Sequence, residues 1–181
     1  LLPFGPDLDS RDFGHDIAVG SGMIAVAQPY YGTERVGAVY FYDEQTGAPI
    51  ERIVGPDEPG AVLEGFGTSV AIAGGRIAIG RGNLITVEGN PQDVFMYDAD
   101  TLTETAHILP PHGSADTHRF GSEVALNGDT LVVCAPGDVP SVNGAIGAAH
   151  TFAPATGAYR NTLALVPPTG VEIADVPRTY R

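Results

Sequence analysis

The 181-residue sequence contains no lysine, and its nine basic residues face 22 acidic ones, which gives a formal net charge of −13. An excess of carboxylates repels phosphate groups, so the composition excludes nucleic acid as the partner and disfavours binding to an anionic membrane. No apolar run approaches the roughly 18 residues that a membrane-spanning helix needs, so direct membrane insertion is not expected. The single cysteine, Cys134, rules out an intrachain disulfide without fixing the cellular compartment.

Motifs of the common enzyme classes are also missing. The sequence has no nucleophile elbow, no phosphate-binding loop and no clear acid–base pair, and its carboxylates fall mostly in turn-like segments. A catalytic role for Cys134 would need a neighbouring base and an exposed thiolate. We therefore expect neither an enzyme nor a cofactor-binding protein. The first residue is Leu1 and no signal-peptide pattern precedes the first repeat, so we expect a processed chain or a part of a longer one.

The most informative feature is an internal repeat. A Phe-Gly pair followed by alternating apolar residues occurs three times, at intervals of 53 and 54 residues, as Phe13-Gly14, Phe66-Gly67 and Phe120-Gly121. A second marker has the same period, because Pro3, Pro56 and Pro110 each lie ten residues before one of these phenylalanines. Pro167 is the fourth of the series, but Pro177 stands where the next Phe is expected, so the pattern breaks at the C-terminus. The repeats span 4–56, 57–110 and 111–167, and 168–181 is a degenerate further unit or a tail.

Each repeat of about 53–57 residues predicts four short strands. Alternating apolar residues mark the strands, and glycine- or aspartate-containing turns separate them. In each repeat the first predicted strand begins at the Phe-Gly pair. The second strands span 24–27, 77–80 and 131–134, the third strands span 38–42, 94–97 and 148–152, and the fourth strands end through Ile53, Ile108 and Leu165. A four-stranded antiparallel meander with this period is typical of the β-propeller blade. The fold class is thus all-β, one propeller region over 1–181, with a sandwich or solenoid as the alternative.

These motifs resemble the FG-GAP repeat, which builds the propeller of integrin α-subunits and of many bacterial surface proteins. The Phe-Gly pair is followed by Ala27-Gln28-Pro29 in the first unit and by Cys134-Ala135-Pro136 in the third, with a degraded Gly80-Arg81-Gly82 in the second. Gly-Ala-Val-Tyr-Phe-Tyr-Asp, at 37–43, and a later Thr-Gly complete the pattern. The likeness extends over roughly residues 1–167. It implies a propeller fold and, in the calcium-free bacterial variant, an exported protein.

Calcium binding does not carry over from the integrin-type repeats. Calcium takes six to eight oxygen ligands, so it needs several carboxylates in one loop. The turns between the first and second predicted strands are two or three residues long, and only Asp129 brings a carboxylate. We expect no metal there. His112, Asp116 and His118 lie in one crossover, but their spacing matches no zinc pattern, and solvated loop residues are the simpler interpretation.

Binding is expected on the side where the connections are long and differ between repeats, because variable loops on a regular scaffold usually carry recognition. Tyr30 and Tyr31 with Arg35 form the best candidate patch, since aromatics and arginine dominate interface hot spots. The alternative is that one tyrosine packs beneath its own loop. Further candidates in the other two loops are Leu84, Ile85, Asp138 and Asn143.

The sequence therefore indicates a non-enzymatic binding or scaffold module of an exported bacterial protein, acting outside the cell, at its surface or in the periplasm. It would recognise a protein or glycan through the long-loop side, in adhesion for example. The alternatives are a structural segment of a multi-chain assembly and a part of a propeller enzyme whose active site lies on other blades. Three blades leave two apolar end faces, so we expect further blades, a homo-oligomer or a larger complex to cover them.

Overall fold

Twelve strands form the described part of the chain. The computed structural model describes residues 2–4, 12–32, 36–56, 65–82, 92–111, 119–137 and 147–164. The first repeat forms β1 (Ile17–Gly20), β2 (Met23–Gln28), β3 (Ala38–Asp43) and β4 (Pro49–Val54); the second forms β5 (Ser69–Ala73), β6 (Arg76–Arg81), β7 (Asp93–Asp98) and β8 (Glu104–Ile108); the third forms β9 (Glu123–Leu126), β10 (Leu131–Ala135), β11 (Ala148–Ala153) and β12 (Ala158–Ala164). The first three strands of each repeat agree with the predicted ones to within a few residues, and β4 and β8 include the predicted Ile53 and Ile108, whereas Leu165 lies outside the described residues.

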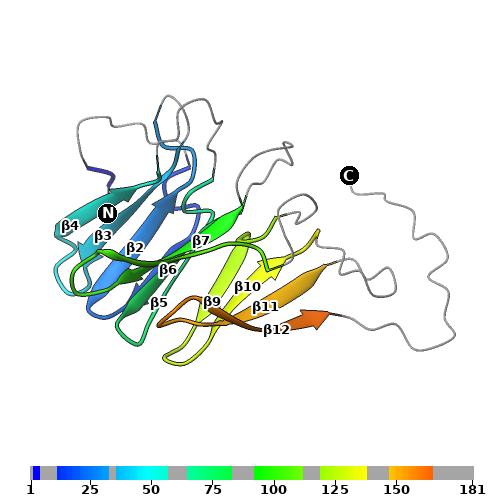
Figure 1. Ribbon diagram of the computed structural model, residues 1–181. Coiled ribbons are helices and arrows are strands. Elements are labelled where there is room, and N and C mark those ends of the chain that lie inside the picture. Colours follow the sequence, from blue (N-terminus) through cyan, green and yellow to red (C-terminus); the bar gives the residue numbers. More distant parts are fainter. Residues whose placement is uncertain are drawn as a thin grey trace, which may run out of the picture.

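Each repeat is one separate antiparallel sheet in which sequence neighbours pair, so the three sheets have the orders β1-β2-β3-β4, β5-β6-β7-β8 and β9-β10-β11-β12. We call them blades one, two and three. The blades stand side by side, with β1 next to β5 and β5 next to β9 (Figure 1). This arrangement of meander sheets with their first strands innermost is that of β-propeller blades. The described residues form an open arc and not a closed ring.

The Phe-Gly pair has the same conformation in all three blades. Gly14, Gly67 and Gly121 have φ angles of 90°, 87° and 82°, a region in which residues with a Cβ are strained. Their N–H groups donate to Ala27, Gly80 and Cys134, which occupy the same place on the second strand of each blade. A Cβ at Gly121 would lie 2.7 Å from the carbonyl oxygen of Asp93 in the preceding blade. The glycine thus allows both the turn and the close approach of adjacent blades.

Two hydrophobic cores join the three blades. Because side chains alternate along a strand, each blade has a front face toward the preceding blade and a back face toward the following one. The back face of blade one and the front face of blade two share a core that includes Val39, Phe41 and Ile79. The back face of blade two and the front face of blade three share a second core, with Met96, Leu131 and Phe152. The front face of blade one carries a smaller aromatic core.

The repeat predicts that Phe13, Phe66 and Phe120 occupy equivalent positions and are mostly buried between adjacent blades. Phe66 and Phe120 are fully buried within the two inter-blade cores, as predicted. Phe13 holds the same sequence position but is only half buried, on the front face of blade one. Burial between adjacent blades is therefore wrong for Phe13, because the described residues place no other blade against the front face of blade one. Pro56 and Pro110 follow β4 and β8 as predicted, whereas Pro167 lies outside the described residues. Over the described ranges, no helix is long and apolar enough to span a membrane.

Candidate binding surfaces

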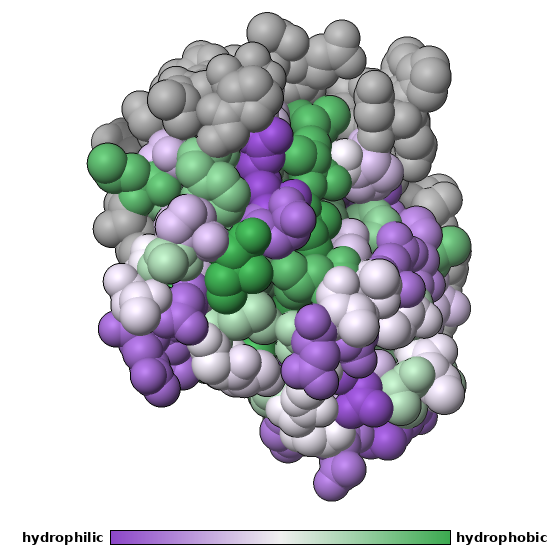
Figure 2. Space-filling model, turned by 90° about the vertical axis from the view of Figure 1, so that its left-hand side faces the viewer, coloured by the Kyte–Doolittle hydropathy of each residue, from purple (hydrophilic) through white to green (hydrophobic). Residues whose placement is uncertain are grey.

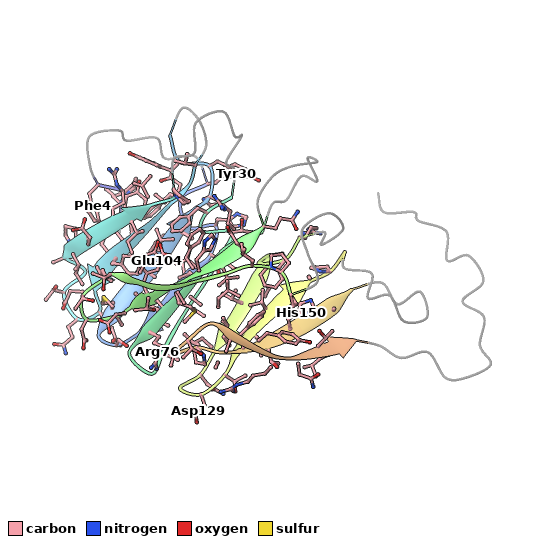
Figure 3. The ribbon with its side chains drawn as sticks, viewed as in Figure 1. Phe4, Tyr30, Arg76, Glu104, Asp129 and His150 are labelled. Atoms are coloured by element: carbon pink, nitrogen blue, oxygen red, sulfur yellow. The ribbon has the colours of Figure 1, made fainter. Side chains whose placement is uncertain are left out.

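The connections divide between two sides of the molecule. Hairpin turns between the first and second and between the third and fourth strands of each blade lie on one side, where Figure 3 labels Arg76 and Asp129. The ends of the second and fourth strands and the starts of the first and third strands lie on the opposite side, next to Tyr30, which is the side that the sequence predicts to carry the long connections. The predicted candidates Arg35, Leu84, Ile85, Asp138 and Asn143 lie outside the described residues, as do His112, Asp116 and His118.

The two adjacent tyrosines do not form one exposed patch. Tyr30 is half buried on the long-loop side, but Tyr31 is only 5% exposed and packs edge-on against Tyr40. The Arg52 Nη1 donates to the Tyr31 hydroxyl over 2.7 Å, and its guanidinium lies 4.8 Å from the Tyr31 ring centroid. Tyr31 is therefore wrong as a predicted contact residue, and the alternative that one of the two tyrosines is packed inside holds for it, because Tyr40 and Arg52 contact its ring and Arg52 binds its hydroxyl. Tyr30 alone of the pair remains a candidate contact.

An aromatic cluster covers the front face of blade one. Phe4 and Phe13 both lie edge-on against Tyr40, and Phe4 also contacts Tyr42. The Tyr42 hydroxyl donates to the Leu2 carbonyl, and burial together with the neighbouring Tyr40 raises the pKa of Tyr42 to about 12. The segment 2–4 is thereby held over the β3 part of this face.

A buried ionic network in blade two was not predicted. Arg81 at the end of β6 and Asp93 at the start of β7 are each 1% exposed and form a two-pronged ion pair, with Nε–Oδ1 and Nη2–Oδ2 distances of 2.8 and 2.5 Å. His107 Nε2 lies 2.6 Å from the same Oδ2, and the imidazole stacks on Phe95. The network ties together the ends of β6, β7 and β8 on the long-loop side. The sequence could have indicated this pair, because Arg81 and Asp93 are opposite charges at paired positions where the first repeat has the neutral residues Gln28 and Ala38.

The carboxylates of the hairpin turns serve local structure. Asp43 accepts hydrogen bonds from the backbone N–H and the hydroxyl of Thr46, and Asp98 accepts the same pair from Thr101. The hydroxyl of Thr46 and then its N–H hold the pKa of Asp43 below its usual range; for Asp98 the N–H of Thr101 is the larger cause. These contacts support the sequence interpretation that acidic residues in turns serve turn geometry.

Ionisable groups do not gather into a metal site within the described ranges, where no cluster of three or more His, Cys, Asp or Glu side chains occurs. The absence of calcium stays a prediction. Cys134 is partly buried on β10, opposite Glu123 on β9. Burial and, secondarily, the Glu123 carboxylate raise the pKa of its thiol. That direction suits a packed side chain and opposes thiolate chemistry.

The structure and the comparisons agree on the class. The blades define the chain as a stretch of β-propeller, and the family model of the FG-GAP repeat matches residues 102–152, from the end of blade two through β11 of blade three. The predicted FG-GAP repeat is therefore confirmed: the matched range includes the Phe120-Gly121 pair, whose backbone geometry the other two pairs share. Among solved structures, BamB from Moraxella catarrhalis is similar at 15% identity and a TM-score of 0.47, over 83% of this chain and 37% of that one. No curated protein matches the sequence significantly.

Proposed function

We propose that the chain is a non-enzymatic binding and scaffold module of an exported bacterial protein, which recognises a protein or glycan through the long-loop side. The observation that carries the proposal is the division of the connections. The hairpin side is closed by short turns whose carboxylates accept hydrogen bonds within the turn, whereas the opposite side, on which Tyr30 lies (Figure 3), is the one to which the sequence assigns the longer connections between strands. A rigid scaffold that presents variable loops at one side is the usual architecture of a recognition surface.

Two further properties support this proposal over catalysis in the cytoplasm. In the described part of the chain, the one buried ionic network satisfies its carboxylate internally, with Arg81 on one side and His107 on the other. Both side chains of the Arg81–Asp93 pair are 1% exposed, so the carboxylate itself is shielded from a substrate. The net charge of −13 and the lack of lysine suit a protein that acts on the outside of the cell.

Binding to arrays of glycans and of surface proteins tests the recognition role. We expect a ligand whose affinity falls at least tenfold in Tyr30→Ala and stays unchanged in the control Arg76→Ala, which alters the start of β6 on the opposite side. A ligand lost equally in both variants, or no ligand on either array, would count against recognition through the long-loop side.

A structural role within a larger assembly is the second candidate, and the exposure of blade one favours it. Ile17 on β1 is 63% exposed, while its repeat equivalents Val70 and Val124 are each 5% exposed because another blade covers them. Val19 is 56% exposed on the same face. Exposed apolar surface of this kind marks an interaction site.

A further inference from the structure

The turn that leads into each Phe-Gly pair has an unusual backbone at its first residue. The residues that precede the three phenylalanines, Asp12, Gly65 and Arg119, have φ angles of 59°, 101° and 73°. In each turn, the carbonyl of this residue accepts the N–H of the residue three positions later, over 2.9 to 3.0 Å. Glycine adopts a left-handed φ freely and aspartate tolerates it, whereas a long side chain such as that of arginine is strained there.

Side chains of blade two hold the turn of Arg119 in this conformation. The Phe120 N–H donates to the Gln92 Oε1 over 3.0 Å, and the Gly121 carbonyl accepts the Ser69 hydroxyl over the same distance. Residues in sparsely populated conformations persist where their surroundings fix them in this way, and they gather at binding and catalytic sites. The backbone of the turn therefore points to a role for the Arg119 side chain outside local folding.

Contacts within the fold do not account for an arginine at this position. The Arg119 side chain is partly buried and its Nε is fully buried, yet no acceptor lies within hydrogen-bond distance of the Nε. Among the described residues, the guanidinium of Arg119 has no ion-pair partner either. Every other described arginine donates a hydrogen bond from its guanidinium, namely Arg52, Arg76, Arg81 and Arg160. A donor that is removed from water without an acceptor is unfavourable, so the fold gains nothing evident from this side chain.

Arg119 lies on the side of the molecule to which the recognition role is assigned. Its counterpart in the second repeat, Gly65, donates its N–H to the Pro29 carbonyl over 3.2 Å, next to Tyr30 on the long-loop side (Figure 3). Arg119 has the corresponding place one blade further along the chain, in the turn that leads into the innermost strand β9. Tyr30 and Arg119 are thus side chains of the same side.

The charges of the chain narrow the ligand that Arg119 could bind. Guanidinium groups bind carboxylates and phosphates through parallel N–H donors. The net charge of −13 repels a ligand with many negative charges, such as a polyuronate or a phosphate-rich chain. Hydrophilic residues predominate at the hairpin turns, along the lower edge of Figure 2. The acidic residues Glu44, Asp100 and Asp129 are exposed in these turns. A single carboxylate on a neutral or basic protein surface meets both conditions.

We propose that Arg119 is a carboxylate-binding residue of the long-loop side, and that its ligand is an acidic side chain of a partner protein. The proposal rests on the recognition role proposed above and names the chemical group recognised. Because the side chain as a whole is only partly buried, part of the guanidinium remains open to a ligand. A carboxylate there supplies the acceptor and the negative charge that the described part of the fold does not.

The variant Arg119→Gly tests whether this side chain serves the fold, because glycine is the residue that the second repeat has at this position. Loss of the backbone strain and of the unbonded buried donor should raise Tm by about 2 °C or more, measured by far-UV circular dichroism. Arg160→Gln, which makes the same change of charge without relieving strain, should not raise Tm. An unchanged or lower Tm in Arg119→Gly would overturn the proposal, because contacts within the chain would then account for the arginine.

Selection from a random peptide display library tests the ligand. Peptides that bind the unmodified chain should share one Asp or Glu in neutral or basic surroundings. Replacing that residue by Asn or Gln should weaken binding about tenfold or more for the unmodified chain and for the control Arg160→Gln, but less than about twofold for Arg119→Gln. The control alters a guanidinium that bonds to Asp129 on the hairpin side.

Selected peptides without a shared acidic residue, or acidic peptides that Arg119→Gln binds as tightly as the unmodified chain does, would overturn the proposal and leave recognition through another part of the long-loop side in place. A glucuronate oligosaccharide that binds through Arg119 when no peptide does would overturn the choice of a protein in favour of an acidic glycan. If neither binds, and no ligand depends on Tyr30, the recognition role fails together with the proposal.

Discussion

Removing Asp93 alone from the buried Arg81–Asp93 pair should destabilise the protein more than removing both partners together. Each side chain is 1% exposed, and the two are joined by two hydrogen bonds. Asp93→Ala leaves a guanidinium buried without its carboxylate, so we expect it to lower the free energy of unfolding by about 3–5 kcal/mol. Arg81→Met leaves the Asp93 carboxylate with His107 as its remaining ionisable partner, and its loss should fall at or below the low end of that range.

The double variant Arg81→Met/Asp93→Ala buries no uncompensated charge. The other blades show that the same ladder position accepts neutral pairs, since it holds Gln28 with Ala38 in blade one and Ala135 with Ala148 in blade three. We therefore expect the double variant to cost less than Asp93→Ala alone, about 2 kcal/mol or less, because exchange of a buried ion pair for apolar side chains of similar volume is often neutral.

Urea unfolding followed by far-UV circular dichroism measures the three free energies. For a chain of this size, a difference of 1 kcal/mol corresponds to a shift in Tm of about 2–4 °C. Losses that add, so that the double variant is less stable than either single variant, would refute the reasoning, because they would mean that the two charges do not compensate each other.

Three further predictions concern other parts of the fold. Phe66→Ala should lower the free energy of unfolding by about 3–5 kcal/mol, and Phe13→Ala by clearly less because Phe13 is half buried; equal losses in urea would contradict the packing between blades. Thr101 holds the pKa of Asp98 below its ordinary value of 3.8. The contribution of the Asp98 carboxylate to the stability of the fold is therefore complete above pH 3.8 and is lost as the pH falls through the lower pKa of the folded state. Asp98→Asn should reduce the loss of stability between neutral and acid pH, and an unchanged pH dependence would argue against the turn contact. Burial and Glu123 raise the pKa of the Cys134 thiol, so iodoacetamide should react slowly with Cys134 at pH 8 and faster in the Glu123→Gln variant. Equal rates in the two proteins would show that the Glu123 carboxylate does not affect the thiol.

The sequence by itself determined the repeat, the strand order and the turns. These features depend on contacts between residues close in sequence: the alternation of apolar side chains defines each strand, and glycine at a left-handed φ defines the Phe-Gly turn. Phe66 and Phe120 could be assigned to the core because their period matches that of the strands. The acidic turns could likewise be assigned to local structure, since Asp43 and Asp98 bond to threonines three residues away.

Only the tertiary structure decided which faces are covered. Tyr30 and Tyr31 look alike in sequence, but Tyr31 is buried because Tyr40 on β3 and Arg52 on β4 pack against its ring. Arg81 and Asp93 are twelve residues apart, and only the β6–β7 pairing brings them together as a buried pair. Ile17 and Val70 are equivalent in the repeat, yet one is exposed and the other buried. The period of a repeat specifies the blade, whereas burial depends on the neighbour that packs against it.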